Sequence, residues 1–250
     1  TAMVWGLSTP PAPPHRVSPY SAACTTMGGG GPAGAFAEGD DVRVLRAAVQ
    51  YQRTGLGKAL VVGRDDDVKA KLDAIGMADA VRELEVVNAA KTDRLDEYKA
   101  FLYTRLQRKG FDRQDVHRLA ARDRHVFASL MLEHGHADGL VTGATRKSAH
   151  VMERINTVFD ADAQHGAVGV TALLLNGRIV LIADTLVHEW PDENDLATIA
   201  ERSAGVARHL GLEPRVAFVS FSTFGYPVSE RAQKMHKAPE ILDARGVDFE

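Results

Sequence analysis

The fold is decided by the stretch Arg178–Tyr226, which reads RIVLIADTLVHEWPDENDLATIAERSAGVARHLGLEPRVAFVSFSTFGY. Its first segment, Ile179–Ile182, is a short run of branched apolar residues without charge, as expected of a strand buried on both faces of a parallel sheet. A long helix follows, and Arg215–Val219 predicts a second strand. The stretch therefore predicts a β-α-β unit with a right-handed crossover and with ligands near the carboxyl ends of its strands.

The helix between these two strands has its own start and stop signals. The Asp192 carboxylate can accept hydrogen bonds from the exposed N–H groups at the start of the helix. Gly211 ends the helix, and Pro214 precedes the next strand. One face is apolar at helical spacing. It consists of Leu196, Ile199, Ala200, Ala204, Ala207 and Leu210.

Polar residues follow both predicted strands. Asp184 and Thr185 come directly after the first strand, where they line a ligand cleft or merely turn the chain. The loop after the second strand carries Ser220, Ser222, Thr223 and Gly225. Hydroxyl and N–H groups in such glycine-bearing turns bind phosphate, and an ordinary turn is the alternative. The sequence thus offers two candidate ligand-binding loops.

Upstream of this stretch, strands and helices alternate from Ala35 onward. Ala35–Ala37, Ala59–Val62 and Leu84–Val87 read as strands, with helices between them. The alternation predicts an α/β fold with a doubly wound, mainly parallel sheet. Val168–Leu175 then pairs with Ile179–Ile182 through Asn176-Gly177, a strong two-residue hairpin signal, so we expect an added hairpin sub-domain.

Three more helices are expected before that hairpin, at about residues 94–109, 112–121 and 125–134. Asp138–Gly143 then reads as a short strand that runs into a glycine turn, and Thr142, Gly143 and Thr145 are further candidate ligand contacts. Arg105 on the first of these helices is a candidate phosphate contact, because guanidinium binds phosphate through paired hydrogen bonds. A solvated basic face is the alternative there.

Composition excludes several classes of function. The 250 residues are 45% hydrophobic and 25% charged, as in soluble globular proteins. A net charge of −3 argues against a nucleic-acid partner, and no apolar run is long enough to span a membrane. Residues 1–33, rich in proline and glycine, predict a disordered tail or linker, and we expect one domain over residues 34–250. The single cysteine, Cys24, favours a reducing cytoplasm.

Neither a metal site nor a dinucleotide site is predicted. His134 and His136 flank Gly135, but no carboxylate or cysteine at ligand spacing accompanies them. No Gly-x-Gly-x-x-Gly motif follows a strand, so nicotinamide binding by this chain is not expected.

Four segments of the chain resemble the phosphate acetyl/butyryl transferase family. They are Phe36–Ala48, Ala137–Gly143, Ile182–Thr185 and Leu212–Gly225. Within the family the chain is most similar to the carboxy-terminal region of bacterial NADP-dependent malic enzymes, on Tyr103–Gly110, Asp184–Glu189 and Ser222–Gly225.

The resemblance implies a two-lobed α/β fold with a cleft for coenzyme A and a small acyl phosphate. It also implies a homo-oligomer. Active members pass acyl groups between coenzyme A and phosphate, whereas the malic-enzyme relatives use the fold as a regulatory module that senses acetyl-coenzyme A. The resemblance is compatible with both functions.

The chain departs from the pattern of active members in three places, and one of them is that Gly28–Gly34 stands where the family's opening strand follows a basic, apolar lead. The resemblance implies a phosphate-gripping arginine on the helix after the glycine turn, and the matching position here is Glu153, with Arg154 one residue later. A helix turns about 100° per residue, so this shift re-aims the guanidinium. The family's catalytic serine, arginine and aspartate lie beyond Glu250, so the domain is expected to be incomplete at its carboxyl end and no catalytic residue is assigned.

Overall fold

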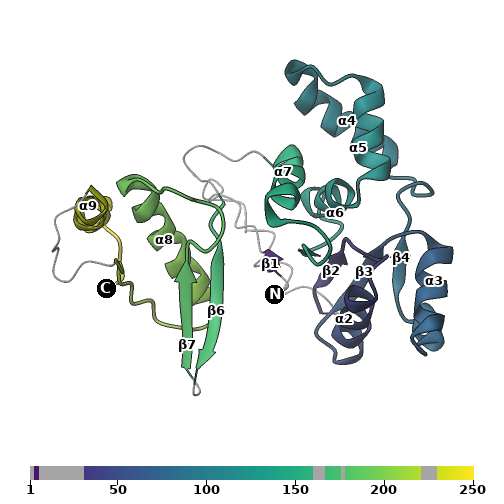
Figure 1. Cartoon of the computed structure of the whole chain (residues 1–250), viewed down its shortest axis with the longest axis horizontal. Helices are drawn as coiled ribbons and strands as arrows, with labels where there is room; N and C mark the ends of the chain where they lie inside the picture. The colour runs from purple at the N-terminus through teal and green to yellow at the C-terminus, as the bar shows by residue number, and fades with distance from the viewer. Residues whose placement is uncertain (1–2, 6–30, 160–166, 176–177, 221–229) are drawn as a thin grey trace, which may run out of the picture. The chain divides into compact units, whose positions relative to one another are not determined.

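The chain forms two compact units, Thr1–Asp160 and Ala161–Glu250. The computed structural model describes residues 3–5, 31–159, 167–175, 178–220 and 230–250, and it is drawn in Figure 1. None of the described helices is both long and apolar enough to cross a membrane.

The first unit is built on a five-stranded sheet with the strand order β1-β5-β2-β3-β4. β5, β2, β3 and β4 are parallel, and β1 pairs antiparallel with β5. The strands are β1 Met3–Trp5, β2 Ala33–Phe36, β3 Lys58–Val62, β4 Glu85–Val87 and β5 Gly139–Thr142. The predicted mainly parallel, doubly wound sheet is therefore confirmed.

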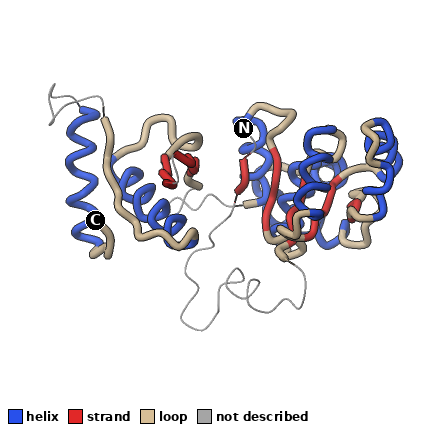
Figure 2. The backbone as a smooth tube through the Cα atoms, turned by 90° about the horizontal axis from the view of Figure 1, so that it is seen from below, coloured by secondary structure: helices blue, strands red, loops and turns tan. Residues whose placement is uncertain are grey.

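Helices cover both faces of this sheet (Figures 1 and 2). Alternate strand residues point to opposite faces, so Ala35 and Leu60 pack under one set of helices while Phe36 and Val61 pack under the other. The first set is α4 Leu95–Leu106, α5 Arg113–Arg122, α6 Arg124–Glu133 and α7 Ser148–Val158. The second is α2 Val42–Arg53 and α3 Asp65–Ala74, with the 3-10 turn η1 Ala78–Arg82.

β2 is the strand at which the winding reverses. The chain leaves β2 through α2 to β3 on one side, whereas β5 lies on its other side. Such a topological switch point opens a crevice at the carboxyl ends of the strands. The segments at these strand ends are residues 37–41 after β2 and residues 143–147 after β5.

The predicted hairpin forms in the second unit. β6 Val170–Leu175 pairs antiparallel with β7 Arg178–Ala183 in a two-stranded sheet, and α8 Glu193–His209 packs on β7 and on α9 Glu230–Arg245. The expectation that Ile179–Ile182 is buried on both faces is wrong: Ile179, Val180 and Ile182 are 40–46% exposed. A ribbon of two strands has too few neighbours to cover both of its faces.

The predicted strand Arg215–Val219 is also corrected. Residues 211–220 form neither helix nor strand, although alternate side chains are exposed as in an extended chain. The backbone N–H of Val216 donates to the Glu250 carbonyl at 2.6 Å. A strand needs a continuous row of backbone partners. The described part of the second unit therefore contains no β-α-β unit.

The start and end of α8 are those that the sequence predicts. The Asp192 carboxylate accepts from the backbone N–H groups of Asn194 and Asp195, and the Asp195 side chain completes a capping box. Gly211 follows the helix in the left-handed conformation, with φ +73°. Five of the six predicted apolar-face residues are buried, and Leu210, at the C-cap, is half exposed.

One short segment of the predicted tail is structured. Met3–Trp5 forms β1, in register with Leu140–Thr142 of β5. Residues 6–30, including Cys24, lie outside the described residues. The boundary between a tail and a domain at residues 33–34 stays a prediction.

Candidate functional site

The ends of β2 and β5 are joined by one buried carboxylate. Glu38 has no exposed surface, and its carboxylate accepts from the backbone N–H groups of Ala144 and Thr145 at 2.7 and 2.9 Å. The Thr145 hydroxyl donates to it as well, at 2.5 Å. Successive N–H groups that converge in this way form an anion-binding turn. In this chain the turn holds the Glu38 carboxylate.

Glu38 remains ionised at this position. Burial alone would raise the pKa of its carboxyl, but the hydrogen bonds from the Thr145 hydroxyl and from the two backbone N–H groups outweigh burial and hold the pKa below 4.5. A carboxylate that only accepts is well matched to three converging donors. The ends of β2 and β5 therefore enclose a fixed, buried negative charge.

A buried histidine lies beside this carboxylate. His125 is 3% exposed, and its Nδ1 is 2.8 Å from the Thr142 hydroxyl at the end of β5. Its Nε2 is buried without a hydrogen-bond partner among the described residues. Burial lowers the pKa of His125 below 6.5, so the ring is neutral at pH 7. Neutral imidazole both donates and accepts, which leaves one nitrogen available to a further polar group.

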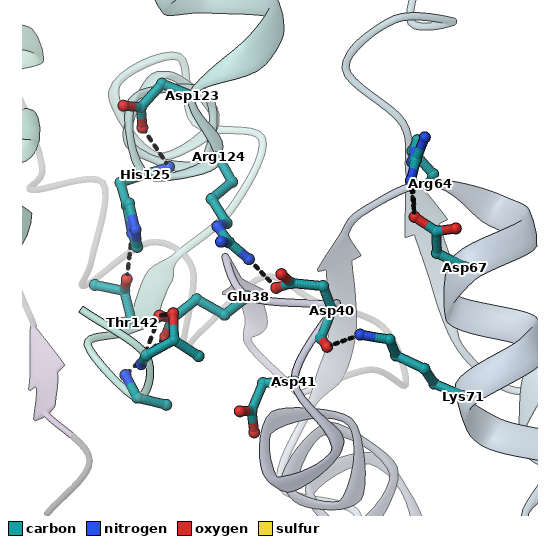
Figure 3. Close-up of polar contacts among 12 residues, drawn as sticks. Glu38, Asp40, Asp41, Arg64, Asp67, Lys71, Asp123, Arg124, His125 and Thr142 are labelled. Atoms are coloured by element: carbon teal, nitrogen blue, oxygen red, sulfur yellow. Dashed lines mark hydrogen bonds and ion pairs between the residues drawn. The ribbon is translucent and has the colours of Figure 1, made fainter. Parts of the chain in front are cut away.

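Charged side chains surround this pair, as Figure 3 shows. Arg124 reaches from the start of α6 to the Asp40 carboxylate, which follows β2. Asp123 caps α6 by accepting from the His125 and Val126 backbone N–H groups, and it also pairs with Arg154 of α7 at 3.2 Å. Acidic and basic side chains thus pair with one another around the start of α6 and the end of β2.

The structure shows what the candidate residues after β5 contact. Thr142 is 3% exposed and contacts His125, so its side chain is internal. Both donors of Thr145 bind Glu38. Gly143 has φ +95°, a conformation that a side chain would strain, and it makes the turn. A ligand role for these three residues stays a prediction, and their observed contacts shape the crevice.

Arg105 lies in a different place, on α4. It lines a shallow pocket of about 780 Å³ at the carboxyl end of that helix. The lining residues are Ala100, Phe101, Thr104, Arg105, Gln107, Arg108 and Lys109. Three of the seven are cationic and none is acidic, so the pocket suits phosphate groups.

In the second unit, Asp184 organises a loop. Its side chain is 2% exposed. Oδ1 accepts from the N–H groups of Gly169, Leu186 and Val187, and Oδ2 accepts from the backbone and Nδ1 of His188. A carboxylate has about four accepting positions, so no capacity remains for a ligand. Of the two interpretations of Asp184, the structural one matches these contacts.

The other candidate residues of the second unit are placed only in part. Thr185 is exposed, its N–H donates to the Gly169 carbonyl at 3.0 Å, and its hydroxyl accepts from Thr171 at 3.0 Å. Ser220 is half-buried. Ser222, Thr223 and Gly225 lie outside the described residues, so their ligand role stays a prediction.

Glu153 and Arg154 lie as the one-residue shift predicts. The Glu153 side chain is 68% exposed, 3.9 Å from the His150 Nδ1, whereas Arg154 is directed to Asp123. The position that the resemblance assigns to a phosphate-gripping arginine therefore presents an exposed carboxylate.

Sequence reasoning missed Glu38, Arg124 and His125. The available signal for Glu38 was a charged residue directly after a buried strand. Arg124 and His125 stand in a charged run that carries no motif. The described residues contain no group of three or more histidines, cysteines or carboxylates that could hold a metal ion.

A doubly wound α/β unit whose two switch-point loops are joined by the Glu38 carboxylate defines a protein of the doubly wound α/β class. The comparison with known families is more specific. The chain belongs to the family described as phosphate acetyl/butaryl transferase, which matches residues 34–250.

The curated relatives include both malic enzymes and phosphate acetyltransferases. The chain is 43% identical over 215 residues to an NADP-dependent malic enzyme of Rhizobium meliloti (strain 1021), covering 86% of this chain and 28% of that protein. It is 28% identical over 216 residues to a phosphate acetyltransferase of Bacillus subtilis (strain 168), covering 86% of this chain and 65% of that one. The chain thus spans about a quarter to two thirds of these relatives' length.

Solved structures share the fold. A phosphotransacetylase from Streptococcus pyogenes superposes with a TM-score of 0.77 at 25% identity, covering 92% of this chain and 70% of that one. The EutD phosphotransacetylase from Staphylococcus aureus gives a TM-score of 0.76 at 24% identity, covering 86% and 64%. The phosphotransacetylase-like α/β fold predicted from the sequence is confirmed.

Proposed function

We propose that this chain is the phosphotransacetylase-like domain of an NADP-dependent malic enzyme and that it binds acetyl-coenzyme A as a regulatory module. The similarity to malic enzymes supports the context, because a match that covers most of this chain and about a quarter of the relative is typical of one domain of a longer protein. One observation favours a ligand-binding function over a catalytic one. The Glu153 carboxylate is exposed, and Arg154 is paired with Asp123.

The charge at position 153 decides between the two functions. A carboxylate there repels an acyl phosphate, and repulsion between like charges about 4 Å apart is worth about 1 kcal/mol even in water. Coenzyme A can still bind, since its phosphates need not approach that position. The pocket lined by Arg105, Arg108 and Lys109 supplies cations for them.

Calorimetry of the whole chain with acetyl-coenzyme A tests the proposal. We expect saturable heat at ligand concentrations up to the millimolar range and none with acetyl phosphate alone. A folded sample that gives no heat at millimolar acetyl-coenzyme A would rule the proposal out.

The second candidate function is an active phosphate acetyltransferase, and the similarity to enzymes of that name favours it. It predicts that the chain, extended to the length of those relatives, forms acetyl-coenzyme A from acetyl phosphate and coenzyme A. Absence of product in the extended, folded protein removes this candidate. A cytoplasmic location and a homo-oligomeric state belong to both proposals.

A further inference from the structure

His125 joins three elements of the first unit in one buried contact. It is the second residue of α6, and its Nδ1 lies 2.8 Å from the Thr142 hydroxyl at the end of β5. Its ring is nearly perpendicular to that of His150 on α7, with the two ring centroids 6.4 Å apart. Only 3% of His125 is exposed. The ring is therefore part of the packing between α6, α7 and the end of β5.

These surroundings suit only the neutral form of the ring. Nε2 of His125 is buried and has no hydrogen-bond partner among the described residues. A neutral imidazole has one N–H donor, which the Thr142 hydroxyl can accept, whereas imidazolium has two. The second donor of a protonated ring would be buried without an acceptor, which is costly in a folded protein. A protonated His125 must therefore gain an acceptor.

The charged groups around the ring show which acceptor is available. Those that act on His125 are Asp123 and Arg124 of α6, Glu38 after β2 and His150 of α7, while β5 contributes the uncharged Thr142. Arg124 pairs with Asp40, and Asp123 pairs with Arg154 of α7 at 3.2 Å. Of the two carboxylates that act on the ring, only Glu38 has no cationic partner among the described residues. Glu38 is the acceptor that a protonated ring can recruit.

The present partners of Glu38 lie on the turn after β5. They are the backbone N–H groups of Ala144 and Thr145 and the Thr145 hydroxyl, all of them uncharged. In Figure 3 the side chains of Glu38 and His125 both extend toward the end of β5. Attraction between opposite charges is stronger in a buried site than in water, so an imidazolium can compete with the donors of the turn.

We propose that His125 and Glu38 form a proton-dependent switch, in which protonation of the ring draws the Glu38 carboxylate to Nε2 and loosens the turn of residues 143–147. The turn stays tethered to α2, because the Arg43 guanidinium donates to the Ala144 carbonyl at 2.9 Å. α7 begins directly after the turn, so the change at Glu38 reaches the start of that helix.

The switch responds at mildly acidic pH. Burial lowers the pKa of His125 below 6.5, and the carboxylates of Asp123 and Glu38 oppose this effect. The ring is therefore neutral at pH 7 and takes up its proton on acidification, before the ordinary titration range of a carboxyl group is reached.

Nuclear magnetic resonance of the whole, ligand-free chain tests the switch, whatever the chain binds. As the pH is lowered from 7.5 to 5, we expect the ring signals of His125 and the amide proton of Thr145 to change with one midpoint. The Thr145 signal should move upfield as its hydrogen bond to the carboxylate is lost. A Thr145 amide that does not move while His125 titrates would overturn the proposal, as would a His125 ring that takes up no proton in the folded chain.

Variants identify the group that drives the change. His125→Gln cannot take up a proton, so its Thr145 amide should keep the same position from pH 7.5 to 5. His150→Gln is the matched control and should retain the coupled change, with a higher midpoint, since His150 opposes the protonation of His125. Glu38→Gln should lower the midpoint of His125, because the favourable charge is removed.

Each alternative result is decisive. A Thr145 transition that survives in His125→Gln shows that another group drives it and overturns the proposal. An unchanged His125 midpoint in Glu38→Gln does the same, because the two side chains are then not coupled. If His125→Gln does not fold, the titration of the unmodified chain decides, since only the switch gives His125 and Thr145 a shared midpoint above the carboxyl range.

Discussion

The buried carboxylate of Glu38 accepts hydrogen bonds from both the backbone N–H and the hydroxyl of Thr145, which lies 107 residues further along the chain. These contacts connect the two loops that border the switch-point crevice. The turn after β5 therefore depends on a single ionised side chain after β2. A substitution at Glu38 should disturb the structure at the end of β5.

Removal of the Glu38 carboxylate should strongly destabilise the first unit. Glu38→Ala leaves three donors unsatisfied, and we expect a loss of about 3 kcal/mol in the free energy of unfolding, measured by urea denaturation. Asp41→Ala, which removes the N-cap of α2 and an exposed ion pair with Arg43, is the control and should cost about 1 kcal/mol. Equal losses for the two variants would contradict the role assigned to Glu38.

Stability should fall on acidification in two stages. The pKa of His125 is lowered in the folded chain, so the unfolded chain binds that proton first and stability decreases as the pH falls below about 6.5. The lowered pKa values of Glu38 and Asp184 add stability that is complete above their ordinary values of 4.5 and 3.8 and is lost below them. Thermal unfolding at pH 7, 6 and 5 measures the first stage, and unfolding at pH 4 and 3 measures the second. A melting temperature that is constant from pH 7 to 4 would refute this account.

The contact between Tyr98 and His136 provides a third prediction. Tyr98 has no exposed surface, burial raises its pKa to about 12, and its hydroxyl lies 2.7 Å from Nδ1 of His136. Tyr98→Phe should therefore cost about 1 kcal/mol in urea denaturation at pH 7. Tyr103→Phe, which keeps its ring beneath the Arg113 guanidinium, should be near neutral. A cost at Tyr103 that matches the cost at Tyr98 would argue against the hydrogen bond.

Restoring the family's arginine should restore affinity for an acyl phosphate. Glu153→Arg replaces an exposed carboxylate, so the fold should be kept, and we expect acetyl phosphate to bind at least tenfold more tightly in calorimetry. Glu153→Gln removes only the repulsion and should give a smaller gain. If neither variant binds more tightly, the charge at position 153 does not explain the preference that we propose.

The basic pocket on α4 predicts an affinity that depends on salt. Arg108→Ala and Lys109→Ala should each weaken acetyl-coenzyme A binding about fivefold at low ionic strength, since an exposed charge pair is worth up to about 1 kcal/mol. The difference from the unmodified chain should shrink at high salt. Arg64→Ala, at an exposed arginine paired with Asp67, is the control. Unchanged affinity in both pocket variants would place the coenzyme elsewhere.

The sequence predicted the regular parts of the first unit well. Ala59–Val62 could be recognised because apolar residues fill a strand that lies between two layers of helices. β1 could not, since three residues are too few to show a strand period. Ile179–Ile182 was recognised as a strand, but its exposure depends on how many strands the sheet has, which an apolar run does not reveal.

The site was harder to predict, because its contacts join residues that are distant in the chain. Asp184 follows a strand, and this placement suggested a cleft. Its actual partners include Gly169, fifteen residues earlier, where an added Cβ would lie 2.6 Å from Oδ1. The role of Glu38 likewise depends on a turn more than one hundred residues away. Local patterns locate such residues at the ends of strands but not the donors that converge on them.

The Asp184 carboxylate contacts residues 186 and 187 only through their backbone N–H groups. Their side chains take no part in these hydrogen bonds, and among the described residues no hydrogen bond or ion pair joins the Glu189 side chain to Asp184. Substitutions at these three positions therefore leave the backbone hydrogen bonds to Asp184 in place. The loop is accordingly a good place to diversify by library selection, with new ligand preferences obtained while the surrounding backbone stays the same.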